Sequence, residues 1–239
     1  MDPAKIFHDL IHNKKVALVG PGRTTTDNYK KVEDADTVVR CGLTIPVLPQ
    51  YKKFYGYRTD IVYNSLDNCE IAGGLIQELI PIWKKESIKL VCNTYPTDEY
   101  FYPNSIAPHN NKVSNYFPVK KLNSDLYFSY KNKLNSRPNS GFCAFMDVFN
   151  MSPKSLYIVG IDFFRSLAFD RYKGSIGGWT HKDFKNDMDP GYSNNHHHPD
   201  KQFKVFKNMC SKFPEIEVDP YIQQFFDDSK YDNLFGELS

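Results

Sequence analysis

The segment from Ser155 to Phe164 constrains the fold of this chain more than any other part of the sequence. It reads Ser-Leu-Tyr-Ile-Val-Gly-Ile-Asp-Phe-Phe, an apolar run with high β propensity that ends at Gly160 and is followed by Asp162. A glycine there permits a tight turn or a close approach of the backbone to a ligand. Because open α/β sheets bind ligands beyond the carboxyl ends of their strands, the pattern predicts a buried strand leading into a ligand-facing loop. A core strand followed by an ordinary turn also fits this segment taken alone.

Apolar runs of strand length alternate with helical patterns along the whole chain. The expected strands cover residues 15–20, 36–40, 59–64, 88–93 and 156–160. Helical spacing of apolar residues appears over 71–85, 139–151 and 199–213. Such alternation predicts an α/β fold with a Rossmann-like, doubly wound and mainly parallel sheet. The length of 239 residues suits a single domain over residues 1–239.

Two long segments interrupt this alternation. Residues 95–134 are rich in Tyr, Pro and Asn, and residues 163–198 are polar with several Gly and Pro. Both follow predicted strands, and long loops inside a compact domain are often functional. We therefore expect a lid-like insertion over the carboxyl edge of the sheet.

Composition and charge exclude several classes of protein. The 30 basic and 28 acidic residues give a net charge of +2, so no nucleic-acid partner is expected. No window approaches the roughly 18 apolar residues of a membrane span, and no signal-peptide core is recognised. These features predict a protein that is cytoplasmic or peripheral at a membrane. Five widely spaced cysteines without a C-x-x-C pattern favour a reducing compartment over a disulfide scaffold or zinc ribbon. Cys92 and Cys143 lie in apolar runs and are expected to be buried thiols.

The first predicted strand opens into a loop of glycines and hydroxyl residues. The sequence Gly-Pro-Gly-Arg-Thr-Thr-Thr suits a loop whose backbone meets a phosphate or a sugar. A dinucleotide site is poorly supported, because Thr25 replaces the third glycine of G-x-G-x-x-G and the second strand ends in Arg40 instead of an acid. A purely structural loop fits the pattern as well. The candidate binding residues here are Gly20, Gly22, Arg23 and Thr24.

An arginine and a small hydroxyl residue stand directly before the helix predicted over 139–151. The sequence is Arg137-Pro-Asn-Ser-Gly. A helix N-terminus beside a guanidinium presents a positive dipole end and charged donors to an anion. Asn139 or Ser140 can also be a plain N-cap, and the two interpretations are compatible. Gly141 completes this candidate turn.

Three consecutive histidines, residues 196 to 198, precede the helix predicted over 199–213. Neighbours in a loop point apart, and no acidic or histidine partner lies at a metal-like spacing, so we expect no metal site. A general base is more plausible, because imidazole titrates near neutral pH. The D-x-D pattern of Asp34 and Asp36 lies at the front of the second strand, away from the edge where a donor is expected.

Taken in order, these pieces resemble the bacterial sialyltransferases of glycosyltransferase family forty-two, the Campylobacter-type lipooligosaccharide enzymes. The similarity runs from about Lys14 to Val218. The matching strings are Lys14-Lys-Val-Ala-Leu-Val-Gly-Pro-Gly-Arg23, Val39-Arg-Cys41, Val62-Tyr-Asn64, Arg137-x-x-Ser140-Gly141, Leu156-Tyr-Ile-Val-Gly-Ile-Asp-Phe-Phe164, Ala168-Phe-Asp170 and Phe184-Lys-Asn-Asp187. The resemblance implies a GT-A-like variant of the Rossmann-like fold.

It also implies transfer of sialic acid from CMP-sialic acid to a glycan or glycolipid hydroxyl, with inversion and with no metal or other cofactor. Family positions that contact the donor fall on Asn64, Ser140, Gly160, Ile161, Asp162 and Phe164, with Arg137 near the anionic groups. The family's catalytic histidine corresponds to His197 or His198, which fit the following helix better than His196. If that histidine lies elsewhere, His181 is the next candidate.

Four positions depart from the family pattern. Family asparagines are replaced by Pro21 and Gly42, and two tyrosines that contact the leaving phosphate are replaced by Phe164 and Leu167. Tyr172 or Tyr192 are candidates to replace one lost hydroxyl. Two alternatives therefore stay open: a transferase for a different nucleotide sugar, and a catalytically weakened glycan- or nucleotide-binding protein. Homo-oligomer formation is a further possibility left open by the sequence.

Overall fold

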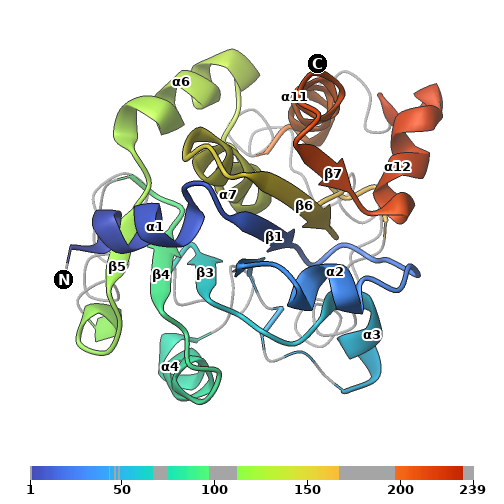
Figure 1. Cartoon of the computed structure of the whole chain (residues 1–239). Coiled ribbons are helices and arrows are strands. Elements are labelled where there is room, and N and C mark those ends of the chain that lie inside the picture. Colours follow the sequence, from blue (N-terminus) through green and yellow to red (C-terminus); the bar gives the residue numbers. More distant parts are fainter. Residues whose placement is uncertain are drawn as a thin grey trace.

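A computed structural model describes residues 2–42, 44–45, 47, 49–66, 75–96, 112–166 and 197–233. Within these residues the chain forms one seven-stranded sheet in which every pairing is parallel (Figure 1). The strands are β1 (Lys15–Val19), β2 (Thr37–Cys41), β3 (Ile61–Asn64), β4 (Leu90–Asn93), β5 (Val119–Lys121), β6 (Ser155–Val159) and β7 (Ile216–Val218).

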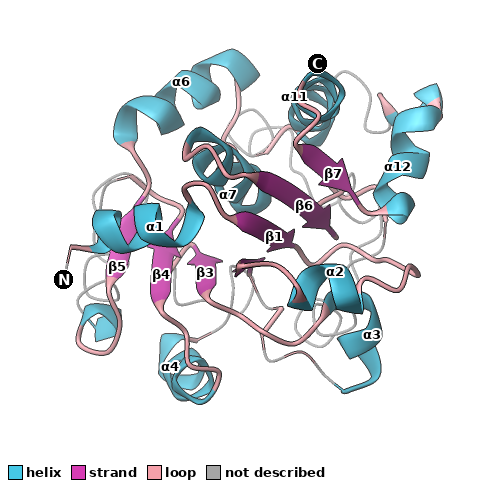
Figure 2. Ribbon diagram, in the orientation of Figure 1, coloured by secondary structure: helices cyan, strands magenta, loops and turns pink. Residues whose placement is uncertain are grey.

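Helices connect the strands and surround the sheet (Figure 2). The α-helices are α1 (Pro3–Ile11), α2 (Tyr29–Glu33), α3 (Lys52–Tyr55), α4 (Ile76–Lys85), α6 (Ser124–Leu134), α7 (Ser140–Asn150), α11 (Pro199–Lys212) and α12 (Pro220–Asp227). Two short 3-10 helices are η1 (Pro49–Tyr51) and η2 (Ser229–Tyr231).

The strand order creates a topological switch point between β1 and β6. The sheet runs β5-β4-β3-β2-β1-β6-β7, so the chain builds outward from β1 on one side and then returns to place β6 on its other side. Beyond the loops that leave β1 and β6, the chain therefore continues to opposite faces of the sheet, with α2 on one face and α11 on the other. In open α/β sheets this crevice is where ligands bind.

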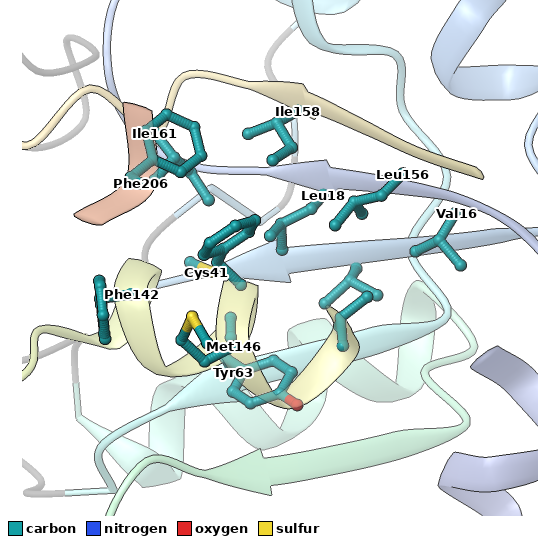
Figure 3. Close-up of a cluster of buried hydrophobic side chains, with 14 of the residues drawn as sticks. Val16, Leu18, Cys41, Tyr63, Phe142, Met146, Leu156, Ile158, Ile161 and Phe206 are labelled. Carbon is teal, nitrogen blue, oxygen red and sulfur yellow. The ribbon is translucent and has the colours of Figure 1, made fainter. Parts of the chain in front are cut away.

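Both faces of the sheet are buried, because alternate strand residues point to opposite sides. Val16 and Leu18 of β1 join the cluster formed with α1, α7 and α11, whereas Ala17 and Val19 join the cluster formed with α2 and α3. Figure 3 shows Leu18 and Ile158 in the first cluster, together with α7 side chains. The near-continuous apolar strands of the sequence are explained by this two-sided burial.

The predicted fold class is confirmed, and the five predicted strands correspond to β1, β2, β3, β4 and β6 with small differences at their ends. The described part of the predicted helix over 71–85 is α4, and the other two predicted helices are α7 and α11. Cys92 and Cys143 are buried thiols, as expected.

The prediction missed the two edge strands. Part of the segment expected to be a lid, 95–134, contributes β5 and α6 to the main fold, and β7 extends the opposite edge beyond β6. Both strands are three residues long and contain charged residues, because an edge strand has only one neighbour and needs little apolar surface. Their pattern in the sequence is therefore too short to detect. Most of the second expected lid segment, 163–198, lies outside the described residues.

No helix in the described ranges is long and apolar enough to cross a membrane.

Candidate functional site

The loops that leave β1 and β6 cross in direct backbone contact at the switch point. The amide of Gly20 donates to the carbonyl of Val159 at 2.8 Å, and the amide of Gly22 donates to the carbonyl of Gly160 at 2.7 Å. A Cβ on Gly20 would lie 2.4 Å from the Gly160 oxygen. Gly160 has φ +64°, and a Cβ there would lie 2.6 Å from the Gly20 oxygen. The close approach of the two loops therefore requires glycine on both of them, directly beyond the carboxyl ends of β1 and β6.

The Tyr55 side chain stabilises the loop after β1 through two hydrogen bonds. Its buried phenol donates to the Gly22 carbonyl at 2.8 Å and accepts from the Thr24 amide at 3.1 Å. The Thr24 hydroxyl is buried and accepts from the Thr26 amide at 3.1 Å. Thr24, predicted as a binding residue, thus stabilises the loop from within.

Asp162 braces the turn that follows β6. Its Oδ1 accepts from the Phe164 amide at 3.1 Å, and its Oδ2 accepts from the Ser166 amide at 2.8 Å and from the Ser166 hydroxyl. The Ser166 Oγ in turn accepts from the Arg23 amide at 2.8 Å, which ties the two loops together. Burial raises the pKa of Asp162 to about 6, although the hydrogen bonds from Ser166 oppose this shift.

The same turn contains two consecutive residues in the left-handed region. Phe163 has φ +54° and Phe164 has φ +65°. Non-glycine residues in such conformations cost about 1–3 kcal/mol each and persist where surrounding contacts over-determine them, commonly at functional sites. Phe164, one of the departures from the family pattern, therefore lies in a strained turn at the carboxyl edge.

The turn before α7 approaches the β6 loop. Asn139 is the N-cap, and its side chain accepts from the Phe142 amide at 2.8 Å. A Cβ on Gly141 would lie 3.4 Å from the Ile161 side chain, so the start of α7 lies directly against that loop. Ser140, the first residue of α7, is half-buried. The side chain of Asn139 thus has the capping role, and α7 presents its N-terminus to the switch point.

Arg137 links this turn to β4 and to the histidines. Its Nη2 donates to the Tyr95 phenol oxygen at 2.6 Å, just beyond the end of β4. Its carbonyl oxygen lies 2.9 Å from Nδ1 of His197. Because a carbonyl only accepts, Nδ1 of His197 carries the proton, and Nε2 of the neutral ring carries the lone pair. That tautomer is the one a general base needs if Nε2 faces the substrate.

His198 has a different environment from its neighbour. Its amide donates to the Ser136 hydroxyl at 3.2 Å, and it is the N-cap residue of α11. Its Nδ1 is buried and has no hydrogen-bond partner among the described residues. Burial lowers the pKa of His198, and the nearby Lys201 acts in the same direction. The two candidate histidines therefore differ, because Nδ1 of His197 has a carbonyl partner and Nδ1 of His198 has none among the described residues.

Asn64 closes the site on the side of β3. It is buried at the end of the strand, and its side-chain oxygen accepts from the Leu66 amide at 2.7 Å. Its register partner on β4 is Asn93, whose side chain accepts from the Tyr95 amide at 2.9 Å. Both carboxamides hold the turns that leave the carboxyl edge.

The structure thus brings the four predicted groups of residues to the carboxyl ends of the strands. Hydrogen bonds join the β1 loop to the β6 loop, and the Arg137 carbonyl in the turn before α7 contacts His197. Tyr55 and Ser166 could not be predicted from the sequence pattern, because each acts through a contact with a distant segment. Leu167, Tyr172, His181, Tyr192 and His196 lie outside the described residues.

The described residues contain no group of three His, Cys, Asp or Glu side chains that could hold a metal ion. The D-x-D pattern lies at the amino ends of the strands, opposite the candidate site. The Asp36 carboxylate accepts there from the amide of Lys15, the first residue of β1, at 2.8 Å. A cavity of about 590 Å³ between α11, β7 and α12 is lined by none of the predicted site residues.

An open, parallel, doubly wound sheet with a glycine crossing at its switch point has the architecture of nucleotide-binding α/β proteins. Comparison with solved structures defines it further. The monofunctional alpha-2,3-sialyltransferase Cst-I from Campylobacter jejuni superposes with a TM-score of 0.52 at 16% identity, covering 86% of this chain and 76% of that one. The sialyltransferase CstII from the same organism, in complex with the substrate analogue CMP-3FNeuAc, gives a TM-score of 0.47 at 17% identity and covers 87% of both chains.

No family model matches the sequence, and no curated protein matches it significantly. The chain therefore has the fold of the sialyltransferase Cst-I, at only 16% sequence identity. This confirms the predicted resemblance at the level of the fold.

Proposed function

We propose that this protein is a sialyltransferase-like glycosyltransferase that transfers sialic acid from CMP-sialic acid to a glycan hydroxyl with inversion. One observation carries the proposal. A histidine whose tautomer is set by the Arg137 carbonyl lies at the same sheet edge as the glycine crossing of Gly20 and Gly160. The histidine is assigned the role of base, and the loops that the glycine crossing holds together are assigned to the donor, so donor and base have separate locations. No cofactor besides the donor is proposed.

The donor side of the site suits an anionic nucleotide sugar. The N-terminus of α7 directs its dipole toward the edge, and the Arg137 guanidinium adds a fixed positive charge nearby. The glycines of the two loops pack against each other and against Asp162, which holds both loops close to this region. We assign the phosphate and carboxylate of the donor to this positive region.

The acceptor side is assigned to His197. In the proposed reaction the Nε2 lone pair removes the proton of the acceptor hydroxyl as its oxygen attacks the anomeric carbon. The new C–O bond forms on the face opposite the nucleotide, the bond to the phosphate oxygen breaks, and CMP leaves with the electron pair. The Arg137 carbonyl stabilises the imidazolium that results, because it accepts from the Nδ1 proton.

A second candidate has its own supporting observation. The turn residue Phe164 stands where the resembled family has a tyrosine that contacts the leaving phosphate, so that hydroxyl is missing from this turn. A weaker leaving-group contact favours either a different nucleotide sugar or a binding protein with little turnover. Donor identity is therefore the property to test first.

A panel of CMP-sialic acid, other nucleotide sugars and CMP alone separates the possibilities. Transfer and hydrolysis are measured by chromatography, and binding is measured by calorimetry. Turnover confined to CMP-sialic acid supports the proposal. Turnover confined to another nucleotide sugar replaces the donor, and binding of CMP without any turnover favours the binding protein.

A further inference from the structure

The Arg165 side chain is buried and donates several hydrogen bonds. The residue lies in the turn after β6, which the Asp162 carboxylate stabilises. Its Nη2 donates to Asp200 at 2.8 Å, and its Nη1 donates to the Phe163 carbonyl at 2.9 Å. Nε and Nη2 donate to the Tyr231 carbonyl at 3.1 and 2.8 Å, and the guanidinium carbon lies 3.6 Å from the centre of the Phe203 ring. This one side chain therefore joins three segments of the chain.

Two of the segments that it joins belong to the candidate site, one on the donor side and one beside the proposed base. Asp200 lies in the first turn of α11, 35 residues after Arg165, and α11 is the helix that His197 and His198 precede. Phe163 and Arg165 belong to the turn after β6. Arg165 thus connects the turn after β6, on the proposed donor side, to α11, the helix that follows the proposed base His197.

The turn needs an external brace, because Phe163 and Phe164 are both left-handed. Arg165 holds the Phe163 carbonyl, and Asp162 holds the Phe164 amide. These contacts select one conformation of a turn that the backbone alone disfavours. Without Arg165, the carbonyl at 163 loses its partner and the turn loses its tie to α11.

The start of α11 is held from its other side by the turn before α7. Gln202 is buried, its side-chain oxygen accepts from the Asn139 amide at 2.9 Å, and its Nε2 lies 3.4 Å from the Arg137 carbonyl. That carbonyl also contacts His197. Gln202 and Arg165 therefore fix the first turn of α11 between the two donor-side segments.

We propose that Arg165 is a positioning residue, which sets the separation between the donor-side turn at 163–166 and the His197 base through its ion pair with Asp200. The inference rests on the proposed transferase function, since it assigns the tie a role in that reaction. Burial lowers the pKa of Arg165 to about 10, so the ion pair keeps its charge near neutral pH.

A buried ion pair can also be a purely structural contact, and the chain offers a matched control for that role. Lys120 and Asp147 form a second buried pair at 2.6 Å, between β5 and α7, that contacts none of the predicted site residues. Lys120→Gln removes one charge from this pair, and Arg165→Gln and Asp200→Asn each remove one charge from the Arg165–Asp200 pair. Thermal unfolding of all three variants establishes which are folded.

Two measurements are made on the folded variants. Steady-state kinetics with CMP-sialic acid gives kcat and KM separately, and hydrogen exchange reports the amides of 163–166. We expect Asp200→Asn to lower kcat about 10–100-fold, the range for a misplacement near 1 Å, with donor Kd changed less than about threefold. It should also speed exchange in the 163–166 turn, although the substituted residue lies on α11. Arg165→Lys should recover part of kcat, because lysine restores the charge but cannot reach all three partners.

Lys120→Gln should leave kcat per folded molecule and exchange in the turn unchanged. The inference is overturned if an active wild-type enzyme keeps its kcat in both Arg165→Gln and Asp200→Asn. It is equally overturned if Lys120→Gln lowers kcat as much as they do. A wild-type protein that turns over no donor at all overturns the proposed function, and the positioning role with it.

Discussion

Two buried ion pairs, one at the carboxyl ends of the strands and one in the core, have the same chemistry but different roles. At the edge, Arg165 pairs with Asp200 at 2.8 Å. In the core, Lys120 pairs with Asp147 at 2.6 Å, and the Asp147 carboxylate also accepts from the Tyr63 phenol at 2.6 Å. Both pairs are nearly excluded from solvent. The two pairs are therefore alike in charge and close in burial, with the Lys120 side chain 12% exposed and the Arg165 side chain completely buried.

What differs is the backbone that each pair holds. Asp147 lies within the regular helix α7, about 10 Å along the axis from Ser140, and it connects that helix to β3 and β5. Arg165 holds an irregular turn with left-handed residues at the switch point of the sheet. The comparison teaches that a buried charge does not by itself mark a site. Strained backbone at the carboxyl edge is the stronger indicator.

The largest expected effect tests the assignment of function to the edge. His197→Ala should lower turnover of a verified donor about 10²–10⁴-fold, since it removes a positioned general base. Donor affinity should change little, because the base faces the acceptor. Initial rates and calorimetry provide the measurements.

Two histidines provide the controls for that variant. His12 makes a similar Nδ1 contact, 3.1 Å from the Met151 carbonyl, but far from the carboxyl edge, and His12→Ala should be neutral. His198→Ala should be mild. A severe loss in His198→Ala with normal turnover in His197→Ala would reverse the assignment between the two residues.

Removal of the core pair should lower the free energy of unfolding and leave turnover unchanged. Asp147→Ala removes the partner of Lys120 and of the Tyr63 phenol, which should cost about 3–5 kcal/mol in the free energy of unfolding. Turnover per folded molecule should stay normal. Denaturant unfolding measures the first quantity, and rates corrected for the folded fraction measure the second.

The double variant Lys120→Met with Asp147→Leu sharpens this prediction. Replacing both charges by apolar groups should recover much of the lost stability, because no buried charge is left unpaired. Lost turnover in a stable double variant would mean that the core pair takes part in function, and the contrast between the two regions would fail.

The buried carboxyl at the edge predicts a pH effect on stability. Burial raises the pKa of Asp162 from the ordinary value of 3.8 to about 6. Between those values the folded protein binds more protons than the unfolded chain, so this group's contribution is fully present below the lower value and is lost as pH rises through about 6. The loss is on the order of 3 kcal/mol.

Denaturant unfolding of the wild type and Asp162→Asn at several pH values tests it. The contributions of other groups cancel in the difference between the two proteins, so the stability of the variant relative to the wild type should increase as pH rises from 4 to 7. A difference that stays constant with pH would show that Asp162 titrates normally.

A smaller effect is expected for donor contacts in the turn before α7. Arg137→Ala and Ser140→Ala should each weaken donor binding by about 1.5–3 kcal/mol, the value of a hydrogen bond to a charged group. The fold should remain intact. Lys154→Ala is the charge-matched control for Arg137, because Lys154 is exposed just before β6 at the other edge of the sheet. Unchanged affinity in both turn variants, measured by calorimetry, would remove this turn from the site.

The smallest expected effect is none. Turnover in the presence of EDTA should equal turnover without it, because the proposed chemistry uses no metal and the described residues hold no group suited to one. Loss of activity that Mn²⁺ or Mg²⁺ restores would contradict the metal-independent mechanism.

Local sequence patterns were sufficient for the five inner strands of the sheet and for the end of the sheet at which the candidate site residues gather. The runs that became β1 and β6 are apolar because both faces of the sheet are covered, and Gly20 and Gly160 follow them directly. Since parallel strands end at one edge, the residues after them were expected to meet there, and they do. The short edge strand β5 was missed because three residues carry too little pattern to detect.

The contacts that complete the site depend on residues far apart in the sequence. Tyr55 meets Thr24 across 31 residues, Arg165 meets Asp200 across 35, and His197 meets the Arg137 carbonyl across 60. No local periodicity encodes such pairs, because each forms only when two separate segments pack together. The sequence by itself thus determined the sheet and the edge at which its polar loops gather. Only the tertiary structure decided which histidine carries an oriented proton and which buried charges hold the site in place.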